Sequence, residues 1–149
     1  IRNTGERNVP WQGRFRPKNP QKYIGDSSQI YYRSSLELRV MRKFDESPDV
    51  VGWASEELTV DYYDPVKRRS RRYFPDFIVK RKDGKTLMVE VKPASQSAPP
   101  VHKKGKRRSR VISEELTWAN NKAKWEAARK FCERNGWEFV VLTEREILK

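Results

Sequence analysis

The chain has 149 residues, which is the usual size of one domain. Its 33 Lys and Arg residues exceed its 20 Asp and Glu residues, so the formal net charge is +13, and a chain this basic is expected to bind a polyanion, with nucleic acid as the leading candidate. With one cysteine and one histidine, the sequence excludes an intrachain disulfide, a zinc site of Cys or His ligands and catalysis by a Ser-His-Asp or Cys-His set, so any metal must be held by carboxylates.

Residues 1–30 are predicted to form an irregular basic arm, because proline and glycine recur along this stretch. Trp11, Phe15 and Tyr23 offer apolar surface that can pin the arm to the body of the protein. An arm that wraps onto nucleic acid and a packed N-terminal extension therefore both fit residues 1–30.

The first helix is predicted over residues 35–44. Ser34 is a good N-cap, and Glu37 three residues later has the spacing of a capping box. Ser47-Pro48 is expected to end the helix. The apolar stripe of this helix consists of Leu36, Val40 and Phe44.

Several strands are predicted to follow. Residues 50–63 hold one or two strands, and the run 67–72 is too charged for a core, so it is expected to be a hairpin tip or loop. A strand over 72–80 is followed by a hairpin turn at 82–85 and by a return strand over 86–92. The alternation of the return strand places Leu87, Val89 and Val91 on one face and Met88, Glu90 and Lys92 on the other.

Residues 94–111 are predicted to form a mobile basic loop, because they combine Ser, Pro and Gly with many Lys and Arg and contain no acid. The second helix is expected over 113–135, with Gly136 as its C-terminal stop. A strand at 137–142 and a short helix complete the chain. These elements predict one domain over residues 31–149.

Three side chains of the predicted hairpin have the chemistry that phosphodiester cleavage needs. Asp76 follows Pro75, which distorts a strand, and Glu90 and Lys92 share one face of the return strand. Two carboxylates can hold a cation through oxygen ligands, and a neighbouring lysine can orient or deprotonate water. Taken singly, Asp76 fits an ordinary strand-end carboxylate, and Glu90 with Lys92 fits an ion pair on a solvated face. Their spacing together favours a site.

The pattern Pro75-Asp76, thirteen residues, then Glu90-Val91-Lys92 resembles the PD-(D/E)xK nuclease superfamily. The resemblance implies an α/β fold with a restriction-endonuclease-like core, in which helices flank a central mixed β-sheet. Short stretches also resemble the head completion nuclease family of tailed bacteriophages, and the endonuclease subunit of heteromeric transposases is similar to the same core. These stretches are Tyr32-Arg33-Ser34, Ser55-Glu56, Arg72-Tyr73-Phe74, Glu90-Val91-Lys92-Pro93, Lys124-Trp125 and Leu142-Thr143-Glu144.

The resemblance implies a Mg²⁺-dependent DNA endonuclease, with Mn²⁺ able to substitute, that acts on packaged phage DNA or its ends. Glu37, Asp76 and Glu90 are expected to bind the metal and, with Lys92, to form the catalytic set, although Glu37 also fits a role in the capping box alone. Low sequence specificity is expected, because no recognition helix stands out. The residues expected to contact nucleic acid are Arg33, Arg72, Lys103, Lys104, Lys106, Arg107, Arg108, Lys122 and Lys124. For Lys122 and Lys124 a solvated helix face is the alternative.

The expected partners are double-stranded or branched DNA and phage head or neck proteins. No apolar run approaches the roughly 20 residues of a membrane helix, so no membrane association is expected. A monomer in the reducing host cytoplasm during phage assembly, or in the virion, fits the sequence. Two alternatives stay open, a non-catalytic DNA-binding structural phage protein and a transposase or junction-resolving endonuclease subunit. Glu56 and Glu57 fit either the site or an exposed turn.

Overall fold

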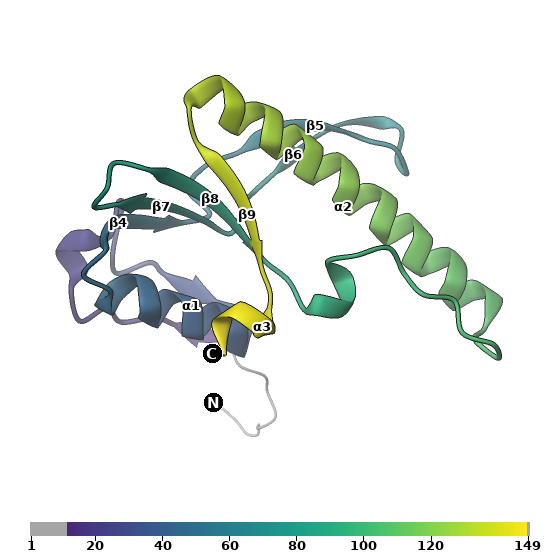
Figure 1. The fold of residues 1–149 in the computed structure, drawn as a ribbon, viewed down its shortest axis with the longest axis horizontal. Helices are drawn as coiled ribbons and strands as arrows, with labels where there is room; N and C mark the ends of the chain where they lie inside the picture. Colours follow the sequence, from purple (N-terminus) through teal and green to yellow (C-terminus); the bar gives the residue numbers. More distant parts are fainter. Residues whose placement is uncertain (1–11, 149) are drawn as a thin grey trace.

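The computed structural model describes residues 12–148, which form an α/β fold around a four-stranded sheet (Figure 1). Its strands lie in the order β4-β7-β8-β9, and β8 pairs in parallel with β9 while the other two pairs are antiparallel. The sheet is therefore mixed and confirms the predicted fold class. The strands are β4 (Val50–Ser55), β7 (Phe77–Arg81), β8 (Thr86–Val91) and β9 (Glu138–Leu142).

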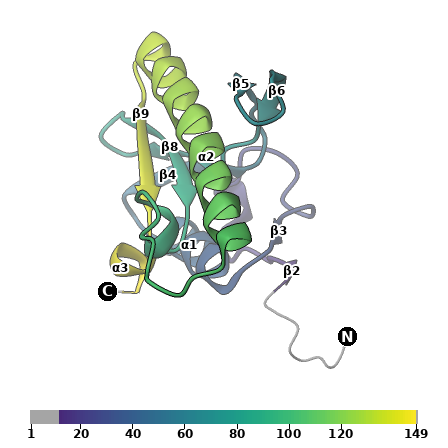
Figure 2. The ribbon, with the colours of Figure 1, turned by 90° about the vertical axis from the view of Figure 1, so that its right-hand side faces the viewer.

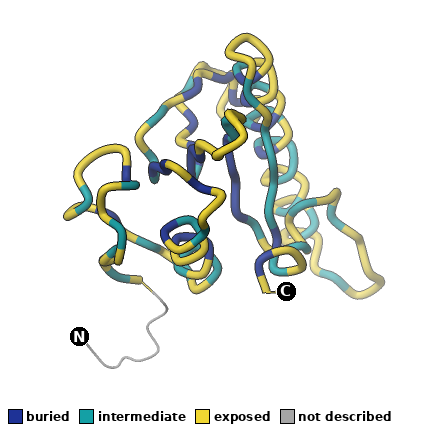
Figure 3. The backbone as a smooth tube through the Cα atoms, turned by 60° about the vertical axis from the view of Figure 1, so that its left-hand side comes forward, coloured by how far each residue is buried: buried dark blue, intermediate teal, exposed yellow. Residues whose placement is uncertain are grey.

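Helices cover both faces of the sheet. The helices α1 (Ser35–Glu46) and α3 (Glu144–Ile147) lie on one face, and α2 (Arg108–Asn135) lies on the other (Figures 1 and 2). Alternation along β8 explains this layering, because Val89 packs in the cluster under α1 while Met88 packs in the cluster under α2. The central strands are accordingly the most deeply buried part of the chain (Figure 3).

The first helix matches its prediction closely. Ser34 is the N-cap, Ser47 is the C-cap, and the predicted apolar stripe packs into the core. The capping box is only half formed, because Ser34 Oγ accepts from the Glu37 N–H at 3.1 Å while Glu37 Oε1 accepts from the N–H of Arg33 rather than that of Ser34. The Glu37 carboxylate therefore binds the N–H of the residue before the N-cap instead of the N-cap itself.

The prediction of a continuous strand over 72–80 was wrong. The chain leaves β6 (Arg69–Tyr73) and enters β7 only at Phe77, with an irregular step between them. Pro75 lies in this step, is fully buried and has no N–H for a sheet ladder. The step lets β6 and β7 belong to different sheets, and it places Asp76 directly at the start of β7.

The basic run at 67–72 is only partly a turn. The strand β6 pairs antiparallel with β5 (Val60–Asp64) in a separate two-stranded hairpin beside α2 (Figure 2). Alternate residues of this hairpin are buried against α2, including Val60, Tyr62 and Tyr73. Burial of one face was sufficient to form a strand in spite of the charge on the other face.

The second helix begins five residues earlier than its predicted start at 113, since α2 starts at Arg108. Residues 108–111 of the predicted basic loop are therefore helical, and residues 94–96 form a short 3₁₀ helix, η2 (Ala94–Gln96). Glu114 forms ion pairs with Lys106 at 2.6 Å and with Arg110 at 3.7 Å, which neutralise part of the charge in this turn. Gly136 ends the helix with a φ of 70°, as predicted.

The N-terminal segment from residue 12 onward packs against the body of the protein. A short ladder pairs β2 (Gly13–Arg14) with β3 (Tyr31–Tyr32), and η1 (Pro20–Lys22) lies between them. Phe15 and Tyr23 are buried around Trp53, so these two residues pin the segment as predicted. Residues 12–30 are thus a packed extension rather than a wholly irregular arm, whereas Trp11 and the preceding residues lie outside the described residues. Nowhere in residues 12–148 is a helix long and apolar enough to cross a membrane.

Candidate active site

Asp76 and Glu90 meet at one end of the β7–β8 hairpin. The register pairs Phe77 with Val89, so the next step along the ladder brings Asp76 opposite Glu90. The Val91 N–H donates to Asp76 Oδ2 at 2.7 Å, which fixes the carboxylate at the start of β7. The two acids that the sequence placed on neighbouring strands are therefore brought together.

Glu90 lies in the interior rather than on a solvated face. Its side chain is 6% exposed, because α2 covers this face of the sheet. The Tyr73 hydroxyl donates to Glu90 Oε1 at 2.7 Å, and Lys92 Nζ lies 3.6 Å from Glu90 Oε2. The interpretation of Glu90 and Lys92 as an exposed ion pair was thus wrong, since a surface pair would not bury its carboxylate.

Two acids of this cluster, Asp76 and Glu37, have raised pKa values. Burial and then the charge of Glu90 hold the pKa of Asp76 well above its usual value. Burial raises the pKa of Glu37, and the charges of Glu56 and Glu90 act in the same direction, against the N–H and charge of Arg33. Raised carboxyl pKa values that combine burial with a like charge are found preferentially at functional sites.

Arg33 and Glu56 form the rim of the cluster next to Asp76. Their side chains make a two-pronged ion pair, with both N–O distances at 2.8 Å. Glu56 has a left-handed backbone with a φ of 53°, and its N–H donates to the carbonyl of Asp76 at 3.1 Å. Glu56 therefore lies at the site, whereas Glu57 is exposed and accepts from the Tyr23 hydroxyl at 3.2 Å.

Lys124 approaches the same cluster from α2. Its ammonium lies 5.8 Å from the ring centre of Tyr73 and 6.0 Å from that of Tyr62. Burial and then the charge of Lys92 lower the pKa of Lys124, while Glu90 opposes this shift. Lys124 is therefore not on the solvated helix face, whereas Lys122 is exposed.

The other predicted contacts to nucleic acid lie further from the acids. Arg72 is exposed on the hairpin with its guanidinium 5.9 Å from the centre of the Phe74 ring. Lys106 Nζ is engaged by the carbonyl of Val101 and by Glu114, both at 2.6 Å. The exposed residues Lys103, Lys104, Arg107 and Arg108 surround the N-terminal end of α2, which projects beyond the sheet (Figure 1).

The donor set of the cluster is made of carboxylate oxygens, which suit a hard divalent cation. Across residues 12–148, no three Asp, Glu, His or Cys side chains are arranged as a ready metal site. Mg²⁺ needs fewer protein ligands than such a group, because it usually keeps several waters and takes one or two carboxylates. Asp76 and Glu90 fit that requirement, and the charge of Glu37 contributes to the raised pKa of Asp76.

Tyr73 is the functional residue that the sequence did not reveal. It belongs to one of the short stretches that carry the family resemblance, but nothing in its local pattern distinguishes it from an aromatic residue that only packs in the core. Burial and then the charge of Glu90 raise its pKa, so its hydroxyl stays protonated and donates to the carboxylate. The contact joins β6 to β8 and depends on how α2 packs the two sheets together.

Known proteins resemble this chain over most of its length. Residues 47–144 match the family model described as the TnsA-like endonuclease N-terminal domain. The chain is also 35% identical over 139 residues to the protein named head completion nuclease of Enterobacteria phage T4, a match that covers 91% of this chain and 93% of that relative. The family-model match includes Asp76, Glu90 and Lys92 and begins after Glu37.

Proposed function

Since this chain belongs to the family of TnsA-like endonucleases and phage head completion nucleases, we propose that it is a Mg²⁺-dependent DNA endonuclease with low sequence specificity. The observation that carries the proposal is the pair of Asp76 and Glu90, of which Glu90 is buried, with Lys92 Nζ 3.6 Å from Glu90. The pair offers oxygen ligands, and the lysine offers the proton chemistry that hydrolysis of a phosphodiester requires. The protein would act on packaged phage DNA or its ends during phage assembly in the host cell. Phage head or neck proteins are its expected protein partners.

The residues of the cluster divide the work of hydrolysis. Asp76 and Glu90 would hold the cation, with Glu37 as the third carboxylate, and Mn²⁺ is expected to substitute for Mg²⁺. When bound, the metal neutralises the scissile phosphate and makes water easier to deprotonate. Lys92 orients the attacking water on the phosphorus and holds or removes its proton. Tyr73 fixes the orientation of Glu90 through its hydrogen bond.

Basic side chains around the cluster would hold the substrate. Arg33 and Lys124 border the acids directly, and both carry charges that attract a phosphate. Further out, Arg72 and the basic residues at the start of α2 can contact the phosphodiester backbone, which has the same chemistry at every base pair. Such contacts account for the expected low sequence specificity.

Cleavage of supercoiled plasmid DNA tests the proposal. Wild-type protein should nick and linearise plasmid in Mg²⁺ or Mn²⁺ and be inactive in EDTA, while Asp76→Ala and Lys92→Ala should each lose most of the rate. Lys130→Ala is a control, because Lys130 is an exposed lysine of α2 that lies outside both the acid cluster and the predicted contacts to nucleic acid. DNA binding without any cleavage would favour the non-catalytic alternative, and full activity of Lys92→Ala would contradict the assignment of that lysine.

A further inference from the structure

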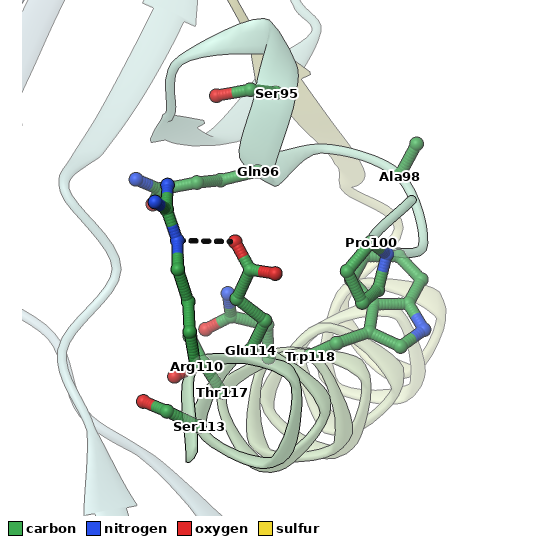
Figure 4. Close-up of a pocket in the computed structure, with 10 residues that line it drawn as sticks. Ser95, Gln96, Ala98, Pro100, Arg110, Ser113, Glu114, Thr117 and Trp118 are labelled. Carbon is green, nitrogen blue, oxygen red and sulfur yellow. Dashed lines mark ion pairs between the residues drawn. The ribbon is translucent and has the colours of Figure 1, made fainter. Parts of the chain in front are cut away.

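A cleft opens beside Lys92, between the β5–β6 hairpin and α2. Its first part is a cavity of about 360 Å³ that includes Lys92 and Lys124 among its lining residues. A second cavity of about 410 Å³ shares Gln96, Thr117 and Asn121 with the first and continues along α2 to Trp118 (Figure 4). We call the two cavities together the α2 cleft.

The first part of the α2 cleft is positively charged. Lys67, Arg71, Lys92 and Lys124 line it, against the single acid Asp64. This acid is already engaged, because Asp64 Oδ2 pairs with Arg71 at 3.0 Å and Asp64 Oδ1 accepts from the N–H groups of Val66 and Lys67. The charge of this part of the cleft therefore complements a phosphodiester backbone that leads to the catalytic lysine.

Basic side chains alone would be sufficient to bind the phosphates of a duplex. The α2 cleft also contains side chains that can contact bases. Side-chain amides of Gln96, Asn120 and Asn121 line it. Gln96 is exposed, and the Oδ1 atom of Asn120 is buried without a hydrogen-bond partner among the described residues. Leu116 and Val66 add apolar surface and are 45% and 40% exposed. Exposed apolar side chains can pack on the face of a base, and amides can reach its Watson–Crick edge, only where the base has left the duplex stack.

The second part of the cleft supplies an aromatic side chain. Trp118 lies against Pro100 at one end of the cavity, and Gln96 and Arg110 lie at the other end (Figure 4). Arg110 Nε forms an ion pair with Glu114 at 3.7 Å, which offsets the acid in this part of the wall. An aromatic ring beside a basic groove is the combination with which proteins bind unpaired nucleic acid strands.

We propose that the α2 cleft holds an unpaired DNA strand next to the scissile phosphate. The preferred substrate is then DNA whose strands separate at the cut, such as a frayed end, a gap or a branch, rather than uninterrupted duplex. This inference rests on the proposed nuclease function and adds to it the class of DNA that the site selects.

Binding in EDTA tests the cleft without cleavage. Fluorescence anisotropy would compare a labelled single-stranded oligothymidylate with a blunt duplex of equal length. Leu116→Glu should weaken single-strand binding about tenfold, the effect of losing one base contact, and should change duplex binding much less. Gln96→Ala should weaken single-strand binding to a smaller extent. Val51→Glu is the matched control, because Val51 is a 55% exposed aliphatic residue on β4 outside the cleft. Equal effects of Leu116→Glu on both ligands, or no effect on the single strand, overturn the inference.

Cleavage in Mn²⁺ gives the second readout. Wild-type protein should cut a duplex with a splayed end faster than the matched blunt duplex, and Leu116→Glu should lose this preference while Val51→Glu keeps it. Equal wild-type rates on the two substrates overturn the inference but leave the nuclease function in place. Failure of wild-type protein to cut any substrate overturns the nuclease function. The anisotropy measurement still tests whether the α2 cleft binds single-stranded DNA.

Discussion

Replacing Tyr73 with phenylalanine isolates the hydrogen bond that orients Glu90. The bond is 2.7 Å long, and both residues are 5% exposed, so no bulk water can replace the lost hydroxyl. A buried hydrogen bond to a charged group contributes about 1.5–3 kcal/mol, so Tyr73→Phe should lower the free energy of unfolding by about that amount. For a domain of this size the melting temperature should fall by about 3–10 °C. Loss of an orienting hydrogen bond of this kind typically weakens metal binding about 10–100-fold.

The assay combines thermal unfolding with Mn²⁺ titration calorimetry. Tyr62→Phe is the matched control, because Tyr62 is also 5% exposed and packs in the same cluster, while no hydrogen bond of its hydroxyl is seen within residues 12–148. If Tyr73→Phe binds Mn²⁺ as tightly as Tyr62→Phe does, Glu90 is not a metal ligand positioned by Tyr73 and the reasoning fails.

Three further predictions follow from the same cluster. An acid whose pKa is raised in the folded protein loses its contribution to stability as the pH rises through that pKa. In EDTA at neutral pH, Asp76→Asn should therefore have a higher melting temperature than wild-type protein, and this gain should vanish as the pH falls toward the usual Asp pKa of 3.8. An equal gain in melting temperature in acid would contradict the cause given for the raised pKa. Because Glu56 has a φ of 53°, Glu56→Gly should be about 1 kcal/mol more stable than Glu56→Ala in denaturant unfolding, and the reverse order would argue against backbone strain. Lys124→Met should slow plasmid cleavage about tenfold, or ~1.4 kcal/mol, whereas Lys130→Met, at an exposed position of the same helix, should not. Similar rates for the two variants would place Lys124 outside the site.

Local patterns in the sequence predicted much of the fold. The alternation of residues 86–92 and the turn at Gly84 defined the β7–β8 hairpin, because side-chain period and turn chemistry depend only on near neighbours. The helix caps at Ser34 and Gly136 were also local and were confirmed. The break at Pro75 was harder, because the proline marked a distortion without showing that the chain changes sheets there.

The candidate site depended on contacts that no local pattern contains. The sequence placed Asp76 and Glu90 on adjacent strands, and the structure brings them together. Burial of Glu90 under α2 and its bond to Tyr73 require packing between segments far apart in the chain. The sequence therefore favoured the site only through the joint spacing of its residues, and taken singly Glu90 and Lys92 fitted an exposed ion pair equally well. The early start of α2 was missed because its first turn is rich in arginine, which resembled a basic loop.

If Asp76 and Glu90 hold a divalent metal beside Lys92, anomalous scattering from crystals soaked in Mn²⁺ should locate the ion at these two residues. We expect an anomalous peak at coordinating distance from carboxylate oxygens of both Asp76 and Glu90, and loss of that peak in Glu90→Gln. A peak only at other residues, or none at Mn²⁺ concentrations that support DNA cleavage, would contradict it.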